Sequence, residues 1–215
     1  MIDLNKKRTA IIAIVVIITV FVSITVVVPM VMSSTLTWST TQGDKTSYHV
    51  TVDAWQLNVS YVVPPPSRYA LLDGINVSAE IVALPELGWF LNGIDFAERV
   101  IRTDKVNITF QNGTAIPDDI SVTLKSILSS CILPTGSWWF IDNSYPDTHS
   151  TEAGADTYWS YSSTSSFQFG YYRFGIDSIT QMSSIVSYET GLPMVVSYYY
   201  SHGVDSMYNL TLLQI

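Results

Sequence analysis

The feature that most constrains this chain is an uninterrupted apolar run near its start. Residues Ala10 to Met32 read AIIAIVVIITVFVSITVVVPMVM, and none of these 23 positions carries a charged side chain. As a helix the run would extend about 35 Å, enough to cross a hydrocarbon core of about 30 Å. Lipid offers the backbone no hydrogen-bond partner, so even this β-branched run is expected to be helical. The run predicts a transmembrane helix at residues 10–32 that anchors the protein in the lipid bilayer.

The charges beside the run predict its orientation. Lys6, Lys7 and Arg8 precede it, whereas residues 33–43 after it contain no charged side chain. Positively charged flanks stay on the cytoplasmic side of a membrane. We therefore expect residues 1–9 to be cytoplasmic and the rest of the chain to lie outside the cell membrane, as in a single-pass signal anchor.

A cleaved signal peptide is the alternative for the same segment. Signal peptides have an apolar core of about 7–15 residues followed by a small-x-small cleavage site. This run is longer, and its end, Val-Pro-Met-Val-Met-Ser-Ser, has no Ala-x-Ala. The sequence favours an uncleaved anchor and leaves cleavage open.

The charge of the remaining chain excludes one class of partner. After residue 32 there are 7 basic and 17 acidic residues, so this part has a formal charge of about −10. Nucleic-acid binding requires clustered Lys and Arg side chains to neutralise phosphates. We expect no nucleic acid as a partner.

Glycosylation sequons supply a second indication of an extracellular domain. Five Asn-x-Ser/Thr triplets all lie beyond the apolar run, among only eight asparagines in the chain. With 48 Ser and Thr among 215 residues, chance gives about two such triplets, and a sequon is meaningful only on a translocated segment. The alternative is accumulation by composition in a Ser/Thr-rich β-protein. The predicted glycosylation sites are Asn58, Asn76, Asn107, Asn112 and Asn209.

The rest of the chain is predicted to be mainly β with minor α. Residues 33–45 are expected to form a polar stalk, and residues 46–215 one extracytoplasmic β-rich domain. Alternation of apolar and polar residues predicts most of the strands, and Gly, Pro and Asp turns separate them. We expect a curved antiparallel sheet or partial barrel with one or two helices packed on it. The expected strands are 46–59, 75–84, 106–110, 158–161, 166–176, 179–188, 194–200 and 207–214.

Helical spacing is clearest after Pro117. Ile120, Leu124, Ile127, Leu128 and Cys131 fall on one helical face, and Asp118 is expected to cap the helix. Residues 88–101 are compatible with either a short helix or a loop. Residues 138–141 are expected to cover the core, and residues 142–156 to form a surface loop.

No residue pattern announces a catalytic centre or cofactor. The three histidines, His49, His149 and His202, are not paired at metal-binding spacing, and the single cysteine, Cys131, is expected to be buried. The sequence also lacks a nucleophile elbow, a P-loop and a dinucleotide fingerprint. We expect no catalytic residue, no metal and no cofactor. Oxygen ligands for Ca²⁺ in the polar loop are a minor alternative: Asp142, Asn143, Asp147, Glu152 and Asp156.

Aromatic runs offer a means of binding. Trp138-Trp139-Phe140 and Tyr198-Tyr199-Tyr200 could stack on sugars or proteins, or else serve the core and surface. Strand alternation places Tyr198 and Tyr200 on one face and Tyr199 on the other.

Five stretches outside the apolar run form a recognisable set: residues 43–52, 80–87, 112–114, 132–138 and 188–193. Together they resemble uncharacterised archaeal surface proteins with one anchor and one β-rich ectodomain. This resemblance implies the same plan and adds little about function. The terminal hairpins, with a Glu-Thr-Gly turn, are also similar in style to the curved sheets of lipoprotein-carrier-like domains, which hold acyl chains in an apolar groove. The second resemblance implies an apolar ligand.

These observations favour a noncatalytic ectodomain for binding or cell-surface structure, with a protein, glycan or lipid as the possible ligand. A carrier or sensor of a lipid or other apolar molecule, held on the concave sheet face, is the alternative. An extracytoplasmic hydrolase is the second alternative.

Overall fold

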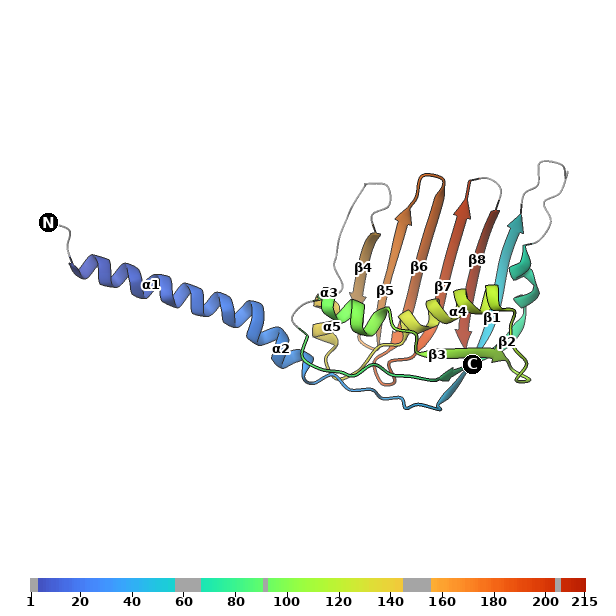
Figure 1. Cartoon of the computed structure of the whole chain (residues 1–215), viewed down its shortest axis with the longest axis horizontal. Coiled ribbons are helices and arrows are strands. Elements are labelled where there is room, and N and C mark those ends of the chain that lie inside the picture. Colours follow the sequence, from blue (N-terminus) through green and yellow to red (C-terminus); the bar gives the residue numbers. More distant parts are fainter. Residues whose placement is uncertain (1–3, 57–66, 91–92, 145–155, 204–205) are drawn as a thin grey trace.

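The structure is a computed structural model that describes residues 4–56, 67–90, 93–144, 156–203 and 206–215. Figure 1 shows a long N-terminal helix that projects from a domain built on one sheet. The helix comprises α1 (Leu4–Val22), a π-helical turn η1 (Ser23–Val27) and α2 (Val28–Ser33). Within the described chain, the stretch Ile11–Ser33 is the one helix long and apolar enough to cross a membrane.

Two threonine hydroxyls inside this helix bond to the helix itself. The Thr19 hydroxyl donates to the Val15 carbonyl oxygen at 2.9 Å, and the Thr25 hydroxyl donates to that of Phe21 at 2.8 Å. Such back-bonding removes the need for water around the hydroxyls. These threonines are therefore compatible with an apolar surrounding.

The domain is mainly β, which confirms the expected fold class. In the described residues, eight strands form a single antiparallel sheet in the order β3-β2-β1-β8-β7-β6-β5-β4. The sheet is open, with β3 and β4 at its edges. β8 lies between β1 and β7 and so joins strands β1 to β3 to strands β4 to β7. The strands are β1 (Lys45–Gln56), β2 (Ile75–Ile81), β3 (Val106–Phe110), β4 (Asp156–Ser162), β5 (Ser166–Phe174), β6 (Ser178–Ser187), β7 (Pro193–His202) and β8 (Ser206–Gln214).

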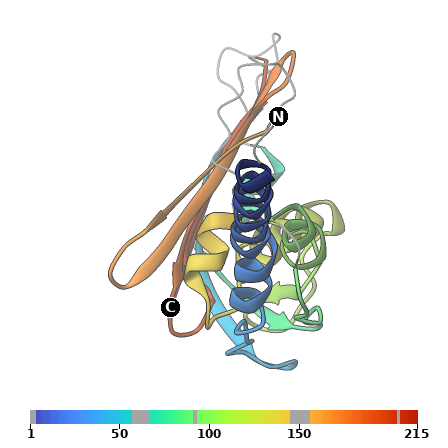
Figure 2. The same ribbon diagram turned by 90° about the vertical axis from the view of Figure 1, so that its left-hand side faces the viewer.

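The two faces of the sheet have different surroundings. Side chains alternate between faces along each strand, so Tyr48 and Val50 of β1 lie on one face and His49 and Thr51 on the other. Figure 2 shows the helices of the domain gathered on one face of the sheet. We call this the covered face, which contains Tyr48 and Val50, and the opposite one the open face.

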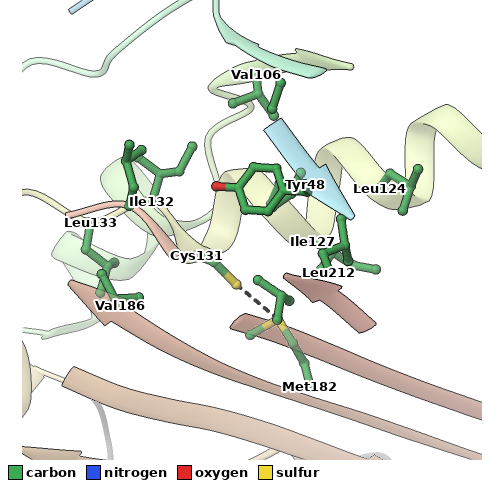
Figure 3. Packing of buried hydrophobic residues seen from close by; sticks show 14 of the residues in the cluster. Tyr48, Val106, Leu124, Ile127, Cys131, Ile132, Leu133, Met182, Val186 and Leu212 are labelled. Atoms are coloured by element: carbon green, nitrogen blue, oxygen red, sulfur yellow. Dashed lines mark hydrogen bonds between the residues drawn. The ribbon is translucent and has the colours of Figure 1, made fainter. Parts of the chain in front are cut away.

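Helix α4 (Asp118–Cys131) supplies the centre of the core. Its buried positions follow the predicted helical spacing, and they pack against Tyr48 of β1, Met182 of β6 and Leu212 of β8 (Figure 3). The expectation that Asp118 caps this helix is wrong. Pro117 occupies the cap position without a side-chain hydrogen bond. Asp118 lies in the first turn, where a carboxylate still interacts favourably with the helix dipole.

Residues 33–45 do not form a free stalk. Ser33, Leu36 and Thr40 are buried, and the backbones of Thr37 and Thr135 exchange two hydrogen bonds of 2.9 and 2.7 Å. The Trp38 indole nitrogen donates to the Pro85 carbonyl at 2.9 Å. The hydroxyl-rich sequence suggested a solvated stalk, but its backbone groups find partners within the domain.

Four short helical elements of the described chain also lie on the covered face. They are η2 (Arg68–Leu72), α3 (Gly93–Phe96), η3 (Ala97–Ile101) and α5 (Trp138–Ser144). The segment 88–101 thus includes a helix, and Trp138 begins one. α3 packs closely on α5. The backbones approach so nearly that a Cβ atom on Gly93 would overlap the Ser144 carbonyl.

Candidate ligand-binding groove

A groove of about 1000 Å³ lies between the covered face of the sheet and the helices. Strands β4 to β7 contribute its floor, and α3, η3, α4 and α5 contribute residues to its walls. The floor residues come from alternate strand positions that face the helices. They include Tyr158, Phe169, Tyr171, Met182 and Tyr198.

The floor is part of a larger set of tyrosines on the covered face. The rings of Tyr158 and Tyr171 are 5.9 Å apart, as are those of Tyr198 and Tyr208. Beyond the groove, Tyr208 stacks on Tyr69 at 4.2 Å. Tyr200 also lies against Tyr208, at 5.4 Å, which confirms that Tyr198 and Tyr200 share a face.

Burial favours the neutral form of two of these tyrosines. Loss of solvent raises the pKa of Tyr198 and that of Tyr208 above the usual value for a phenol. A neutral phenol can both donate and accept a hydrogen bond. The floor therefore combines flat apolar rings with polar atoms.

The walls mix apolar, hydroxyl and charged side chains. Val122 and Ile127 of α4 are apolar, whereas Thr123, Ser126 and Ser130 bring hydroxyls. Two carboxylates and two guanidinium groups also line the groove, so their formal charges balance. The charged residues are Glu98, Asp104, Arg102 and Arg173.

This lining suits a neutral amphipathic ligand. Small-molecule sites are usually apolar cavities of about 300–1000 Å³ with a few polar groups that orient the ligand. Aromatic rings on the floor can pack against a flat or apolar surface. Balanced charges provide no selection for a strong anion or cation. Sequence reasoning placed Tyr198 correctly but could not assemble the groove, because local sequence does not show where α3, η3, α4 and α5 pack over the sheet.

Lys105, which sequence reasoning missed, is fully buried behind a groove wall. Its ammonium nitrogen donates to the carbonyl oxygens of Ser129 (2.7 Å), Thr103 (3.3 Å) and Ile101 (3.4 Å). Burial lowers the pKa of this lysine to about 7, because the charged form loses its hydration. Isolated Lys residues in a polar segment give no sequence signal for such burial.

Cys131 is buried, which confirms the expectation from its apolar neighbours. Its sulfur lies 3.8 Å from that of Met182 (Figure 3). Burial raises the pKa of the thiol to about 11, so it is protonated at neutral pH. The arrangement is that of a core side chain rather than of a nucleophile.

The histidines do not converge in the described residues. His49 is half-buried on the open face, with Nδ1 2.8 Å from Asn76 Oδ1, and His202 is exposed at the end of β7. His149 lies outside the described residues. Among the residues that the structure describes, no group of three His, Cys, Asp or Glu side chains could hold a metal ion.

The calcium alternative concerned residues 142–156, which the sequence predicts as a surface loop. This prediction is wrong at both ends, because Asp142 and Asn143 lie in α5 and Asp156 begins β4. The Asp142 carboxylate accepts a hydrogen bond of 2.7 Å from the Ser160 hydroxyl, and Asn143 bonds to the Trp139 carbonyl. Asp147 and Glu152 lie outside the described residues. The alternative therefore stays a prediction.

Three sequons occupy strands in the same way. Asn76, Asn107 and Asn209 all lie on the open face, on β2, β3 and β8. The middle residue of each triplet points into the core instead: Val77, Ile108 and Leu210 are buried. Strand alternation thus returns the Ser or Thr of each triplet to the face of its asparagine.

The remaining sequons are at turns or undescribed. Asn112 is exposed in the turn after β3, where its side-chain oxygen accepts hydrogen bonds from the Thr114 amide (3.0 Å) and hydroxyl (2.7 Å). The positive φ of Gly113, 83°, is typical of glycine in a tight turn. Asn58 lies outside the described residues.

The predicted orientation residues Lys6, Lys7 and Arg8 lie in the first part of α1, before the apolar stretch. Their position fits the expected cytoplasmic end, and the orientation itself stays a prediction.

No protein-family model, curated protein or solved structure matches the chain. The resemblance to archaeal surface proteins therefore stays a prediction as well.

Proposed function

We propose that this is a single-pass membrane protein whose extracytoplasmic domain binds a neutral amphipathic ligand without transforming it. The groove carries the proposal, because its volume of about 1000 Å³ and its mixed lining match those of a small-molecule site. Apolar parts of the ligand would pack on the rings of Tyr171 and Tyr198. Its polar parts would bond to hydroxyls such as that of Ser126.

The sequence signals for an outside location support this placement. Lys6, Lys7 and Arg8 precede the helix that is long and apolar enough to span a membrane. Asn76, Asn107 and Asn209 face away from the groove, because they lie on the open face. Glycans attached there would leave the ligand site accessible.

A lipid taken from the membrane is the second candidate ligand. The observation that favours it is the position of α5, which contributes Asn143 and Ser144 to the groove and also contacts α2. One end of the groove therefore adjoins the outer end of the proposed anchor. A lipid with a small uncharged polar group would match the balanced charges of the lining.

Native mass spectrometry of the full-length protein, released from membranes in mild detergent, tests the proposal. We expect a noncovalent small-molecule adduct on the wild type and its loss on Tyr198→Ala. Tyr199→Ala is the matched control, because this neighbouring tyrosine is also half-buried but lies on the open face. A lipid fragment pattern would select the second candidate. A wild type without adduct, or equal adducts on both variants, would contradict the proposal.

A further inference from the structure

Two tryptophans of the domain are unusually exposed. Trp89 retains 67% of its surface exposed and Trp139 retains 52%, whereas Trp55, the next most exposed, retains 38%. An exposed indole leaves a large apolar surface in water, although its N–H can still bond to polar groups. The pair therefore requires an explanation beyond core packing.

Both tryptophans adjoin one cluster of buried phenylalanine rings. Each exposed tryptophan precedes a buried phenylalanine: Phe90 follows Trp89, and Phe140 follows Trp139. The rings of these two phenylalanines are 6.1 Å apart, and both meet the edge or face of Phe96, at 5.3 and 5.5 Å. The two exposed tryptophans are therefore held next to one buried cluster of aromatic rings.

This cluster lies where the apolar helix joins the domain. The Phe90 amide donates to the Ser33 hydroxyl oxygen at 3.2 Å, and Ser33 is the last residue of the apolar stretch. Helix α2 also contacts α5, which carries Trp139. Figure 1 shows α2 beside α3 and α5, and Figure 2 looks at this side of the domain along the N-terminal helix.

Amphipathic aromatic rings concentrate at the headgroup level of membranes, where the apolar body and the N–H both find partners. We propose that Trp89 and Trp139 seat the domain on the outer surface of the bilayer. This inference rests on the proposed anchorage through the N-terminal helix. The outer end of that helix fixes the bilayer surface beside the two indoles.

The expected surface is that of a zwitterionic membrane. The chain beyond residue 32 is acidic overall, and the basic side chain nearest in sequence, Arg99, pairs with Asp95 at 3.4 Å and lies over the Phe90 ring. A polybasic patch, which anionic lipids would attract, is lacking among these described residues. Indole insertion rather than charge therefore provides the contact.

Contact of Trp89 and Trp139 with the bilayer would also orient the groove. Asn143 of α5 and Gly93 of α3 line the groove, and their elements adjoin the aromatic cluster. With Trp89 and Trp139 at the interface, this end of the groove is held close to the headgroups. A helix anchor alone would leave the domain free to change its tilt.

Depth-dependent fluorescence quenching tests the inference on the full-length protein in phosphatidylcholine nanodiscs. All six tryptophans lie beyond the apolar helix, so quenching by lipids brominated near the glycerol end of the acyl chains reports contact by the domain. We expect clear quenching of the wild type and loss of most of it in a Trp89→Phe/Trp139→Phe variant. Trp55→Phe, on the open face, is the control and should remain as quenchable as the wild type.

Equal quenching in the double variant and the wild type would overturn the proposed contact of Trp89 and Trp139 with the bilayer. An unquenched wild type would also overturn it. Alkaline extraction of membranes separates this failure from failure of the anchor. A wild type that stays in the membrane pellet preserves the anchor whatever the quenching shows. A wild type released into the supernatant would overturn both proposals.

Discussion

The ammonium nitrogen of Lys105 lies 2.7 Å from the carbonyl oxygen of Ser129, in the last turn of α4. The same nitrogen reaches the carbonyl of Ile101, the last residue of η3. Carbonyls at helix C-termini carry partial negative charge and lack partners within the helix. One buried lysine side chain therefore joins two helix ends behind the groove.

This arrangement predicts a pH dependence of folding. The pKa of Lys105 falls from 10.5 to about 7 on folding, so between these values the unfolded chain binds more protons. The free energy of unfolding should therefore rise as pH increases from 7, by at most about 1.4 kcal/mol per pH unit. Above pH 9 the opposite shift of Cys131, from 9.0 to about 11, counteracts the rise.

Urea unfolding at pH 7, 8 and 9 measures this dependence. Lys105→Met should flatten the rise, while Lys125→Met, which removes a half-buried lysine elsewhere on α4, should retain it. An unchanged slope in Lys105→Met would refute the assignment.

A second prediction concerns the junction between the apolar helix and the domain. Gly136 has a φ of 94°, and a Cβ atom there would overlap the Thr35 carbonyl. Gly113 has a similar φ of 83° but nothing within 4 Å of its added Cβ. Both Gly→Ala changes should cost about 1–2 kcal/mol for the left-handed backbone, and Gly136→Ala should cost a further 1–3 kcal/mol or so for overlap.

Denaturant titration of the two variants in the same detergent gives the comparison directly. Equal losses would mean that the chain around Thr35 moves aside without resistance. In that case the junction would be looser than its backbone pairing of Thr37 with Thr135 indicates.

A third prediction concerns the sequons of the open face. Since Asn76, Asn107 and Asn209 face away from the core, a glycan on any of them would extend from the open face. Asn→Gln at each position should lower the intact mass of the protein from its native membranes by one glycan. Asn143→Gln, outside any sequon, should not. A wild-type mass equal to that of the bare chain, 23.9 kDa, would exclude glycosylation.

Much of the sheet could be predicted because apolar and polar side chains alternate along most of the strands. The strand at Val106–Phe110 was placed at its observed bounds, and the helix from Asp118 to Cys131 followed from apolar spacing. Both signals depend on which side of an element is buried, and local sequence records that property.

The site could not be predicted in the same way, because it depends on distant pairings. Residues 138–144 form too few turns to show helical periodicity, so α5 was expected only as core-covering aromatics. Lys105 looks like a surface residue until the carbonyls of η3 and α4 surround it. The hydroxyls of residues 33–41 suggested solvent, although their partners, such as Thr135, lie about a hundred residues away along the chain.

The central place of β8 has a consequence for when the domain can fold. β8 pairs with β1 on one side and β7 on the other. Until β8 is present, strands β1 to β3 and strands β4 to β7 are not joined in one sheet. The sheet therefore cannot close until residues 206–214 have left the ribosome or translocation channel. During that interval Val50 and Leu212, neighbours in the finished core, remain apart.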